Sequence, residues 1–228
     1  MSDLLTVIMP ALNEAGCIAD IVSSIPVAEF AARGFETEIL VVDNGSMDGT
    51  GELARKAGAR VICEPRRGYG HAYLLGFKEA KGSIICTLDA DGTYPACILP
   101  EMVENLLQED LEFISTNRFA FMSDGAIPKV RRLGNGILTL ASRVLFQLPF
   151  RDSQSGMWVF RAKLLDNMKL QAGGMALSEE IKIEAAWRLK AHCAELPIHY
   201  DRRYGASKLR LWRDGISNLV YLVRKRLF

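Results

Sequence analysis

Residues 84–92 read Ile84-Ile85-Cys86-Thr87-Leu88-Asp89-Ala90-Asp91-Gly92, an apolar run that passes directly into two carboxylates and a glycine. A short apolar run bounded by turn-forming residues predicts a β-strand that is buried on both faces. Such strands are typical of parallel sheets that carry helices on both sides. Ligands bind these sheets beyond the carboxyl ends of the strands, so Asp89 and Asp91 stand where a binding site is expected.

Strand-like and helix-like segments alternate on both sides of this run. The predicted strands are 4–9, 38–42, 60–63, 84–88, 112–116, 157–160 and 195–199. The predicted helices are 18–30, 51–57, 71–81, 98–107, 133–148 and 178–190. This alternation predicts an α/β fold with a mostly parallel central sheet flanked by helices. Pro10, Asp43 and Asp89 each end a predicted strand, which places them on one rim of the sheet.

Size and composition limit the classes of function. The 228 residues suffice for one large domain, and without an internal repeat or long linker we expect a single domain over 1–228. A net charge of +1 argues against nucleic acid as a partner. The five cysteines form no C-x-x-C pair, which fits a reducing cytoplasm. We expect neither a signal peptide nor an apolar segment of the roughly 20 residues that span a bilayer.

The two carboxylates of Asp89 and Asp91 suit a divalent cation. Spaced two residues apart at a strand end, they can approach one hard cation together, and substrate phosphates can complete its oxygen shell. A cation there would neutralise a diphosphate leaving group. The alternative is an ordinary turn, in which two aspartates at this spacing are common.

Other predicted loops reach the same rim. Asp43 can accept hydrogen bonds from a base or ribose, although a capped turn with permissive glycines is the better explanation of this segment when it is taken alone. Asn13 and Glu14, after Pro10, can reach a nucleotide or cap the next helix. Gly68 follows two arginines and precedes a helix, where backbone donors and guanidiniums suit an anion.

Together these segments resemble the family 2 glycosyltransferases, which have a Rossmann-like domain of the GT-A type. The matching segments are Val7-Ile8-Met9-Pro10-Ala11-Leu12-Asn13-Glu14, 38–50, 66–70 and 87–95. The resemblance implies that Asp89 and Asp91 hold Mg²⁺ or Mn²⁺ against the diphosphate of a UDP- or GDP-linked sugar, bound mainly by residues 1–118. The implied nucleotide-sugar site comprises Pro10, Asn13, Glu14, Asp43, Gly68, Asp89, Ala90, Asp91, Arg202 and Lys208.

The second half resembles polyprenyl-phosphate sugar synthases of the dolichyl-phosphate mannose or glucose type. The matching runs are Asp152-Ser153-Gln154-Ser155-Gly156-Met157 with Phe160-Arg161, Ser178-Glu179-Glu180-Ile181-Lys182-Ile183-Glu184, and Arg202-Arg203-Tyr204-Gly205-Ala206-Ser207-Lys208-Leu209. The resemblance implies that Arg118, Arg131 and Arg132 receive the acceptor phosphate, and that Arg118 and Arg131 join Asp89 and Asp91 as catalytic residues. Thr93 departs from the mannose synthases, which often carry Gln there, so the metal ligation at this position and the donor sugar stay open.

The chemistry agrees with an inverting transfer of a hexose to a polyprenyl (dolichyl or undecaprenyl) phosphate. A lipid phosphate is anionic near neutral pH and can attack the anomeric carbon without a strong base, so positioning by cationic groups supplies much of the rate. Arg202, Arg203 and Lys208 suit a loop that closes over the donor, with Gly205 as its hinge.

Two alternatives remain. With the same donor site and a saccharide or other soluble acceptor, Asp152, Glu179 or Glu180 would have to deprotonate a hydroxyl. A non-catalytic nucleotide-sugar-binding regulatory subunit is the other alternative, and the intact pair of Asp89 and Asp91 argues against it.

Residues 119–228 form the expected acceptor half. The segments 133–150 and 216–228 combine apolar side chains with arginines and can lie on an anionic membrane surface, although a core helix and a solvated basic tail explain them equally well. Related chains often continue into transmembrane helices. We therefore expect a cytoplasmic protein that is peripheral at the cytoplasmic face of the membrane, either alone, with a membrane-anchoring subunit or as a homo-oligomer.

Overall fold

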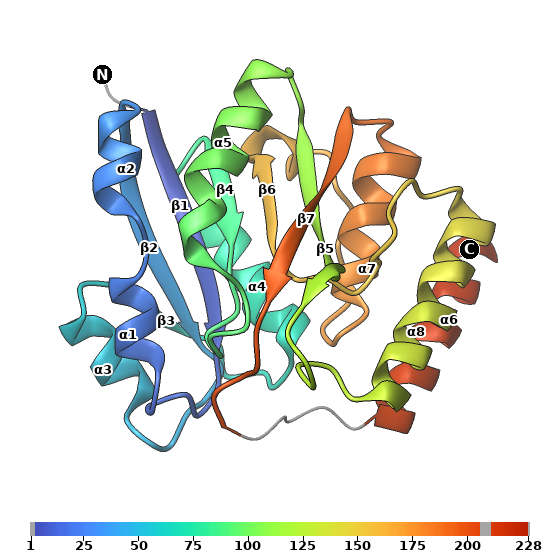
Figure 1. Cartoon of the computed structure of the whole chain (residues 1–228), viewed down its shortest axis with the longest axis horizontal. Coiled ribbons are helices and arrows are strands. Elements are labelled where there is room, and N and C mark those ends of the chain that lie inside the picture. The colour runs from blue at the N-terminus through green and yellow to red at the C-terminus, as the bar shows by residue number, and fades with distance from the viewer. Residues whose placement is uncertain (1–2, 206–210, 228) are drawn as a thin grey trace.

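The computed structural model of the chain describes residues 3–205 and 211–227. Within them, one seven-stranded sheet has the order β3-β2-β1-β4-β6-β5-β7 (Figure 1). The strands are β1 (Asp3–Ala11), β2 (Phe35–Asp43), β3 (Arg60–Cys63), β4 (Ile84–Thr87), β5 (Phe113–Met122), β6 (Trp158–Arg161) and β7 (Cys193–Tyr200). All neighbours pair in parallel except β6, which is antiparallel to β4 and β5. The predicted mostly parallel α/β sheet is confirmed.

Helices cover both faces of the sheet. The α-helices are α1 (Ile18–Ser23), α2 (Val27–Ala32), α3 (Thr50–Lys56), α4 (Tyr69–Glu79), α5 (Leu99–Gln108), α6 (Lys129–Phe146), α7 (Leu177–Lys182) and α8 (Leu211–Leu227); a π-helical stretch (Ile183–Arg188) follows α7, and short 3₁₀ turns lie at Ala96–Ile98 and Ala162–Leu164. Buried residues of α1, α2, α3 and α5 pack on one face, and those of α4, α6, α7 and α8 belong to the core on the other. None of the described helices is long and apolar enough to cross a bilayer.

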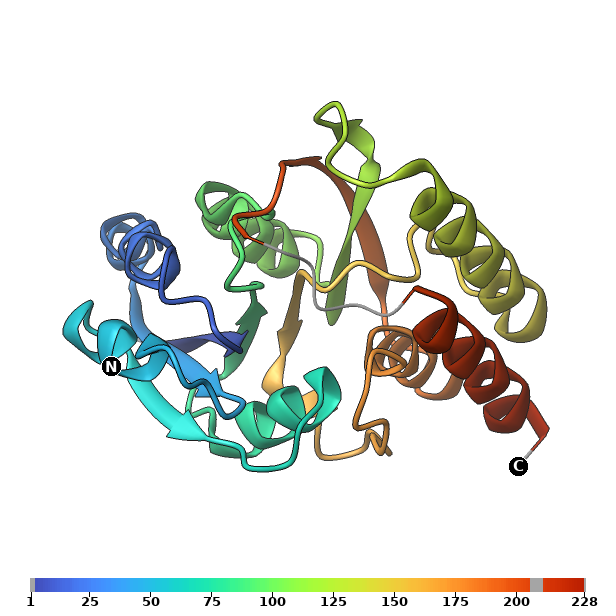
Figure 2. The same ribbon diagram turned by 90° about the horizontal axis from the view of Figure 1, so that it is seen from below.

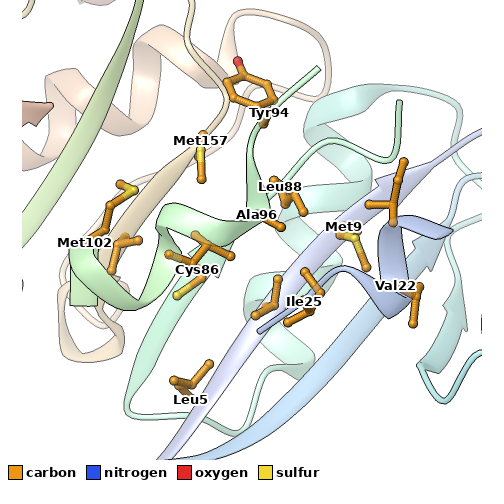
Figure 3. Close-up of a cluster of buried hydrophobic side chains, with 14 of the residues drawn as sticks. Leu5, Met9, Val22, Ile25, Cys86, Leu88, Tyr94, Ala96, Met102 and Met157 are labelled. Atoms are coloured by element: carbon orange, nitrogen blue, oxygen red, sulfur yellow. The ribbon is translucent and has the colours of Figure 1, made fainter. Parts of the chain in front are cut away.

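Strand β1 supplies both cores because successive side chains of a strand point to opposite faces. Leu5 and Met9 pack with residues of α1 and β4, as Figure 3 shows, whereas Ile8 packs with α4 on the other face. Each fully buried aliphatic side chain contributes about 1.5–3 kcal/mol. This burial on both faces holds the central strands in place and so sets where their carboxyl ends leave the sheet.

Two prolines shift the predicted bounds. The single helix expected over 18–30 is wrong, because Pro26 separates α1 from α2; proline lacks the N–H and clashes with the preceding turn. Pro10 does not end the first strand as predicted, since β1 continues to Ala11, which pairs with Asp43. The pairing of β1 with β4 stops at Ile8, so Pro10 has a ladder neighbour only in β2 and behaves as an edge residue.

Candidate active site

A cavity of about 450 Å³ opens at the carboxyl ends of the strands, a volume typical of small-molecule sites. Figure 2 views the molecule from this side. The loops after β1, β2 and β4, the start of α6 and residues after β7 contribute to its wall. Eight of the predicted site residues line it: Pro10, Glu14, Gly68, Asp89, Ala90, Asp91, Arg118 and Arg131.

Asp89 and Asp91 lie in the turn that follows β4. One Asp91 oxygen, Oδ1, accepts hydrogen bonds from the backbone N–H of Thr93 at 3.1 Å and from its hydroxyl at 2.6 Å. The Tyr69 hydroxyl donates to Asp89 Oδ1 at 3.3 Å. Thr93, which departs from the mannose synthase pattern, is buried and orients one of the two carboxylates.

The two carboxylates interact unfavourably with each other. Burial and the charge of Asp91 raise the pKa of Asp89 to about 7, although Arg118, Tyr69 and Arg203 act in the opposite direction. Within residues 3–205 and 211–227 no group of three or more His, Cys, Asp or Glu side chains could hold a metal. The protein therefore offers two carboxylates, a donor set that fits an oxygen-preferring divalent cation whose remaining ligands are phosphate oxygens and water.

Arg203 ties the segment after β7 to this turn. Its guanidinium lies 3.0 Å from Glu14 Oε1 and 3.4 Å from Asp91 Oδ2. The backbone N–H of Tyr204 donates to the Asp91 carbonyl at 2.9 Å, and the Tyr204 ring lies 2.5 Å from where a Cβ on Gly92 would stand. Position 92 therefore requires glycine for two reasons: its φ is +77°, and a side chain there would collide with the Tyr204 ring.

The neighbouring Arg202, which the sequence placed at the donor, is directed elsewhere. Its Nε donates to the Asp124 carbonyl at 2.8 Å, and it does not line the cavity. Lys208 lies outside the described residues. Gly205, the predicted hinge, has a φ of +75° that glycine adopts readily.

Asn13 and Asp43 hold the loop after β2 in shape. Asn13 Oδ1 accepts from the N–H of Met47 at 2.9 Å, and Asp43 Oδ1 accepts from the N–H of Ser46 at 2.8 Å. Neither lines the cavity. These hydrogen bonds are those of a structured turn. Direct contact of Asn13 and Asp43 with a nucleotide remains a prediction.

Asn44, which sequence reasoning missed, positions the loop that carries Gly68. Its buried amide donates to the carbonyls of Glu64 and Arg66 at 3.0 and 2.8 Å and accepts from the N–H of Gly68 at 2.8 Å. A Cβ on Gly68 would lie 2.2 Å from the Gly173 carbonyl oxygen, and the φ of Gly68 is +143°. Only glycine fits where these two loops meet.

Arg118 is held by a buried ion pair. Its Nε and Nη2 donate to the two Asp152 oxygens at 2.7 and 2.9 Å, and its guanidinium carbon lies 5.4 Å from the centre of the Tyr200 ring. Burial opposes the ionisation of Asp152, but the charge and hydrogen bonds of Arg118 outweigh it and lower the Asp152 pKa. Asp152 is therefore a partner of Arg118 and is not available as a base.

The structure separates Arg131 from Arg132. Arg131 lines the large cavity, whereas Arg132 lines a second, shallow hollow of about 300 Å³ together with Arg143 and Arg151. The resemblance implies that both arginines bind the acceptor phosphate, whereas the structure places them at two different hollows.

The other predicted base candidates lie behind the cavity wall. Burial raises the pKa of Glu179 to about 8, and its Oε1 accepts from Gln154 Nε2 at 2.7 Å. Glu180 is buried, accepts from backbone N–H groups and pairs with Lys225. Gln154 itself lines the cavity, as does Asp214 of α8. The sequence signal for Asp214 was its place as the lone acid in a basic segment.

Comparison with known proteins identifies relatives along most of the chain. Residues 6–168 match the sequence model described as Glycosyl transferase family 2. The chain is 34% identical to "Glycosyltransferase AglJ" of Haloferax volcanii over 98% of this chain and 72% of that protein. It is 31% identical to the same organism's "Dolichyl-phosphate hexose transferase", over 94% of this chain and 90% of that one.

Solved structures share the fold. Glucosyl-3-phosphoglycerate synthase from Mycobacterium tuberculosis, solved with Mn²⁺, UDP and glucosyl-3-phosphoglycerate, superposes with a TM-score of 0.77. The match covers 98% of this chain and 80% of that chain at 23% identity. At that identity the likeness establishes the GT-A architecture and no more.

Proposed function

This chain belongs to glycosyl transferase family 2 and is a hexosyltransferase, and on that premise we propose that it moves a hexose, with inversion, from a nucleotide-sugar to a polyprenyl phosphate. One observation carries the proposal: a single cavity holds a carboxylate pair suited to a metal diphosphate and two arginines suited to a second phosphate. The name of the relative "Dolichyl-phosphate hexose transferase" supports the same acceptor class.

The donor side is built around Asp89 and Asp91. We assign to them a Mg²⁺ or Mn²⁺ ion, which would neutralise the diphosphate as it leaves; the fold relative crystallised with Mn²⁺ and UDP supports this assignment. Glu14, Gly68 and Ala90 line the same cavity and suit the nucleotide-sugar. Pro10 lines it with them. Asn13, Asp43 and Lys208 remain assigned to the donor by resemblance alone, whereas Arg202 is directed to the Asp124 carbonyl.

The acceptor side uses Arg118 and Arg131. A phosphate oxygen of the acceptor forms the new bond to the anomeric carbon as the bond from that carbon to the diphosphate breaks. No proton has to be removed, because the phosphate is already ionised near neutral pH. Asp152 fixes the guanidinium of Arg118, so this charge is in place before the acceptor binds and costs little reorganisation.

A hydroxyl acceptor is the second candidate, and Asp214 is the observation that favours it. This carboxylate lines the cavity from α8, and a hydroxyl acceptor needs a base of this chemical type. The substitution Asp214→Asn separates the two: transfer to a phosphate should persist, whereas transfer to a hydroxyl should fall by about 10²–10⁴-fold.

The deciding experiment follows radiolabel from the donor. The chain is incubated with labelled UDP-glucose or GDP-mannose, Mn²⁺ and short-chain polyprenyl phosphate, and the organic phase is counted. We expect label in that phase with the parent chain and little with Arg131→Gln. Label that enters only water-soluble products would contradict the lipid acceptor.

Location and assembly complete the proposal. We infer one domain over 1–228, with the donor half at 1–118 and the acceptor half at 119–228, peripheral at the cytoplasmic face of the membrane. The exposed apolar side chains of α6 and α8 support contact with a membrane or with a membrane-anchoring subunit.

A further inference from the structure

Helices α6 and α8 carry exposed apolar side chains on the side away from the sheet. The two helices lie side by side at one end of the molecule in both views (Figures 1 and 2). They bury Leu138, Phe146 and Leu222 in the core, so the opposite side faces outward. We call this side the outer face; its exposed apolar residues are Val130, Leu133, Ile137, Leu140 and Val144 of α6 and Ile216, Leu219, Val220, Val223 and Leu227 of α8.

The outer face is too apolar and too regular for a solvated surface. Its residues recur at spacings of three and four along each helix, which is the pattern of a continuous apolar stripe. Val144 is 71% exposed and Leu227 is 69% exposed. Contiguous apolar patches of this kind mark interaction surfaces.

Cations border the stripes. Helix α6 contains no acidic residue, and Asp214 is the one acid of α8. At 100° per residue, Arg132 and Arg143 stand along one edge of the α6 stripe, and Arg224 and Arg226 stand on either side of the α8 stripe. An apolar face bordered by arginines complements a lipid surface with anionic headgroups.

The shallow hollow beside α6 adds a site for one anion. Arg132, Arg143 and Arg151 line it together with Phe119 and Thr139. Among the described residues no carboxylate forms an ion pair with any of these three arginines, in contrast to Arg118. Guanidinium groups bind phosphate oxygens in paired, charge-assisted hydrogen bonds, so three around one hollow fit a phosphate group.

We propose that the outer face rests on an anionic phospholipid bilayer and that Arg132, Arg143 and Arg151 bind the phosphate of one lipid headgroup in the adjoining hollow. A second copy of the chain is a poorer occupant, because pairing two outer faces would bring their arginines together. The assignment gives Arg132 a role separate from that of Arg131. It requires no transfer reaction and stands or falls independently of the acceptor.

Vesicle flotation with the full chain tests the proposal. The vesicles are phosphatidylcholine alone or phosphatidylcholine with phosphatidylglycerol, and neither contains a polyprenyl phosphate. We expect the parent to float mainly with the anionic vesicles. The triple variant Arg132→Gln, Arg143→Gln, Arg151→Gln should lose roughly a hundredfold in its partition coefficient. Each of the three arginines near the anionic surface should account for a similar share of that factor.

Matched variants separate local binding from net charge and folding. Arg55→Gln, Lys78→Gln and Lys81→Gln together remove the same charge from exposed sites outside α6 and α8. This control should lose less than about threefold, because charges farther than a Debye length from the lipid are screened. Leu133→Ser with Leu140→Ser and Val144→Ser should weaken binding to both kinds of vesicle, with an unchanged thermal midpoint because all three side chains are exposed.

Three results would overturn the proposal. The first is a parent that fails to float with anionic vesicles, and the second is an arginine triple variant that floats as well as the parent. The third is that the parent binds no vesicles and forms a dimer in solution, and that the substitutions of Leu133, Leu140 and Val144 dissociate this dimer. If the chain floats as predicted but transfers no label to the organic phase, this proposal is upheld and the polyprenyl phosphate acceptor is rejected.

Discussion

The buried pair of Arg118 and Asp152 gives a quantitative test of the site's architecture. Asp152→Asn keeps the size of the side chain and removes its charge. The Asp152 side chain is fully buried and that of Arg118 is 10% exposed, so the remaining guanidinium would be left charged and poorly solvated. Removing one partner of a buried pair costs about 3–5 kcal/mol. Coulomb's law gives about 4 kcal/mol for charges about 4 Å apart at an effective dielectric constant of 20, which agrees.

Urea unfolding measures this cost. The midpoint should fall with little change in slope, because the surface exposed on unfolding stays the same. Glu52→Gln is the matched control: its partner Lys56 also lies 2.7 Å away, but both side chains are more than two-thirds exposed, and such pairs contribute about 0–1 kcal/mol. A loss for Asp152→Asn no larger than that of the control would refute the view that Asp152 holds Arg118 in place.

Three further changes test the cavity and the residues packed behind its wall. Replacing Asp89 and Asp91 together with Asn should abolish sugar transfer while the thermal midpoint stays level or rises, since two carboxylates that repel each other are removed; unchanged turnover would exclude the metal role. Gly156→Ala should cost about 1–3 kcal/mol in urea unfolding and slow transfer, because the new Cβ would lie 2.2 Å from the Tyr69 hydroxyl; an unperturbed midpoint would disprove this contact. Burial raises the pKa of Glu179 from 4.5 to about 8, so the folded state binds more protons than the unfolded state between those values and stability falls as pH rises through them. Glu179→Gln should flatten this decline in the free energy of unfolding, and a decline of the same steepness in the variant would assign it to another group.

The residues at the rim of the site can be predicted from the local sequence. The apolar run predicts strand 84–88, and a parallel strand leaves the residues after it at the carboxyl edge of the sheet, so local sequence alone places Asp89 and Asp91 at the site. Gly68 was found in the same way, because it opens the helix after β3. Pro26 was missed as a helix break because apolar spacing continued on both sides of it.

Neighbouring arginines show where local sequence stops being informative. Consecutive side chains point to opposite sides of an extended backbone and 100° apart on a helix. Arg203 reaches Asp91 while Arg202 turns to Asp124, and Arg131 lines the cavity while Arg132 does not. The pairs are alike in composition, and only the tertiary placement of their segments decides which member faces the site.

Asp214 and Gln154 were missed for a different reason. Gln154 stands in a run that matches by resemblance and Asp214 is the lone acid of a basic segment, but neither signal points to a cavity, and both residues are distant in sequence from β4. Asn218 Nδ2 of α8 donates to Gln154 Oε1 at 3.3 Å, so the docking of α8 brings both residues to the site. Lys225 contributes to this docking, since it lies 3.1 Å from Glu180 and 2.7 Å from Glu184, contacts that the sequence does not specify.

The position of α6 connects the two proposals. Arg131 and Arg132 are consecutive, yet one lines the large cavity and the other the hollow beside the outer face. The cavity and the proposed lipid surface are therefore separated by no more than the width of this helix, about 10 Å. If both proposals hold, an acceptor phosphate in the headgroup layer would lie within about one helix width of Arg131, with its polyprenyl chain among the lipids. A soluble acceptor would gain nothing from the apolar stripes of α6 and α8, so the outer face favours the lipid phosphate over the hydroxyl that Asp214 could serve.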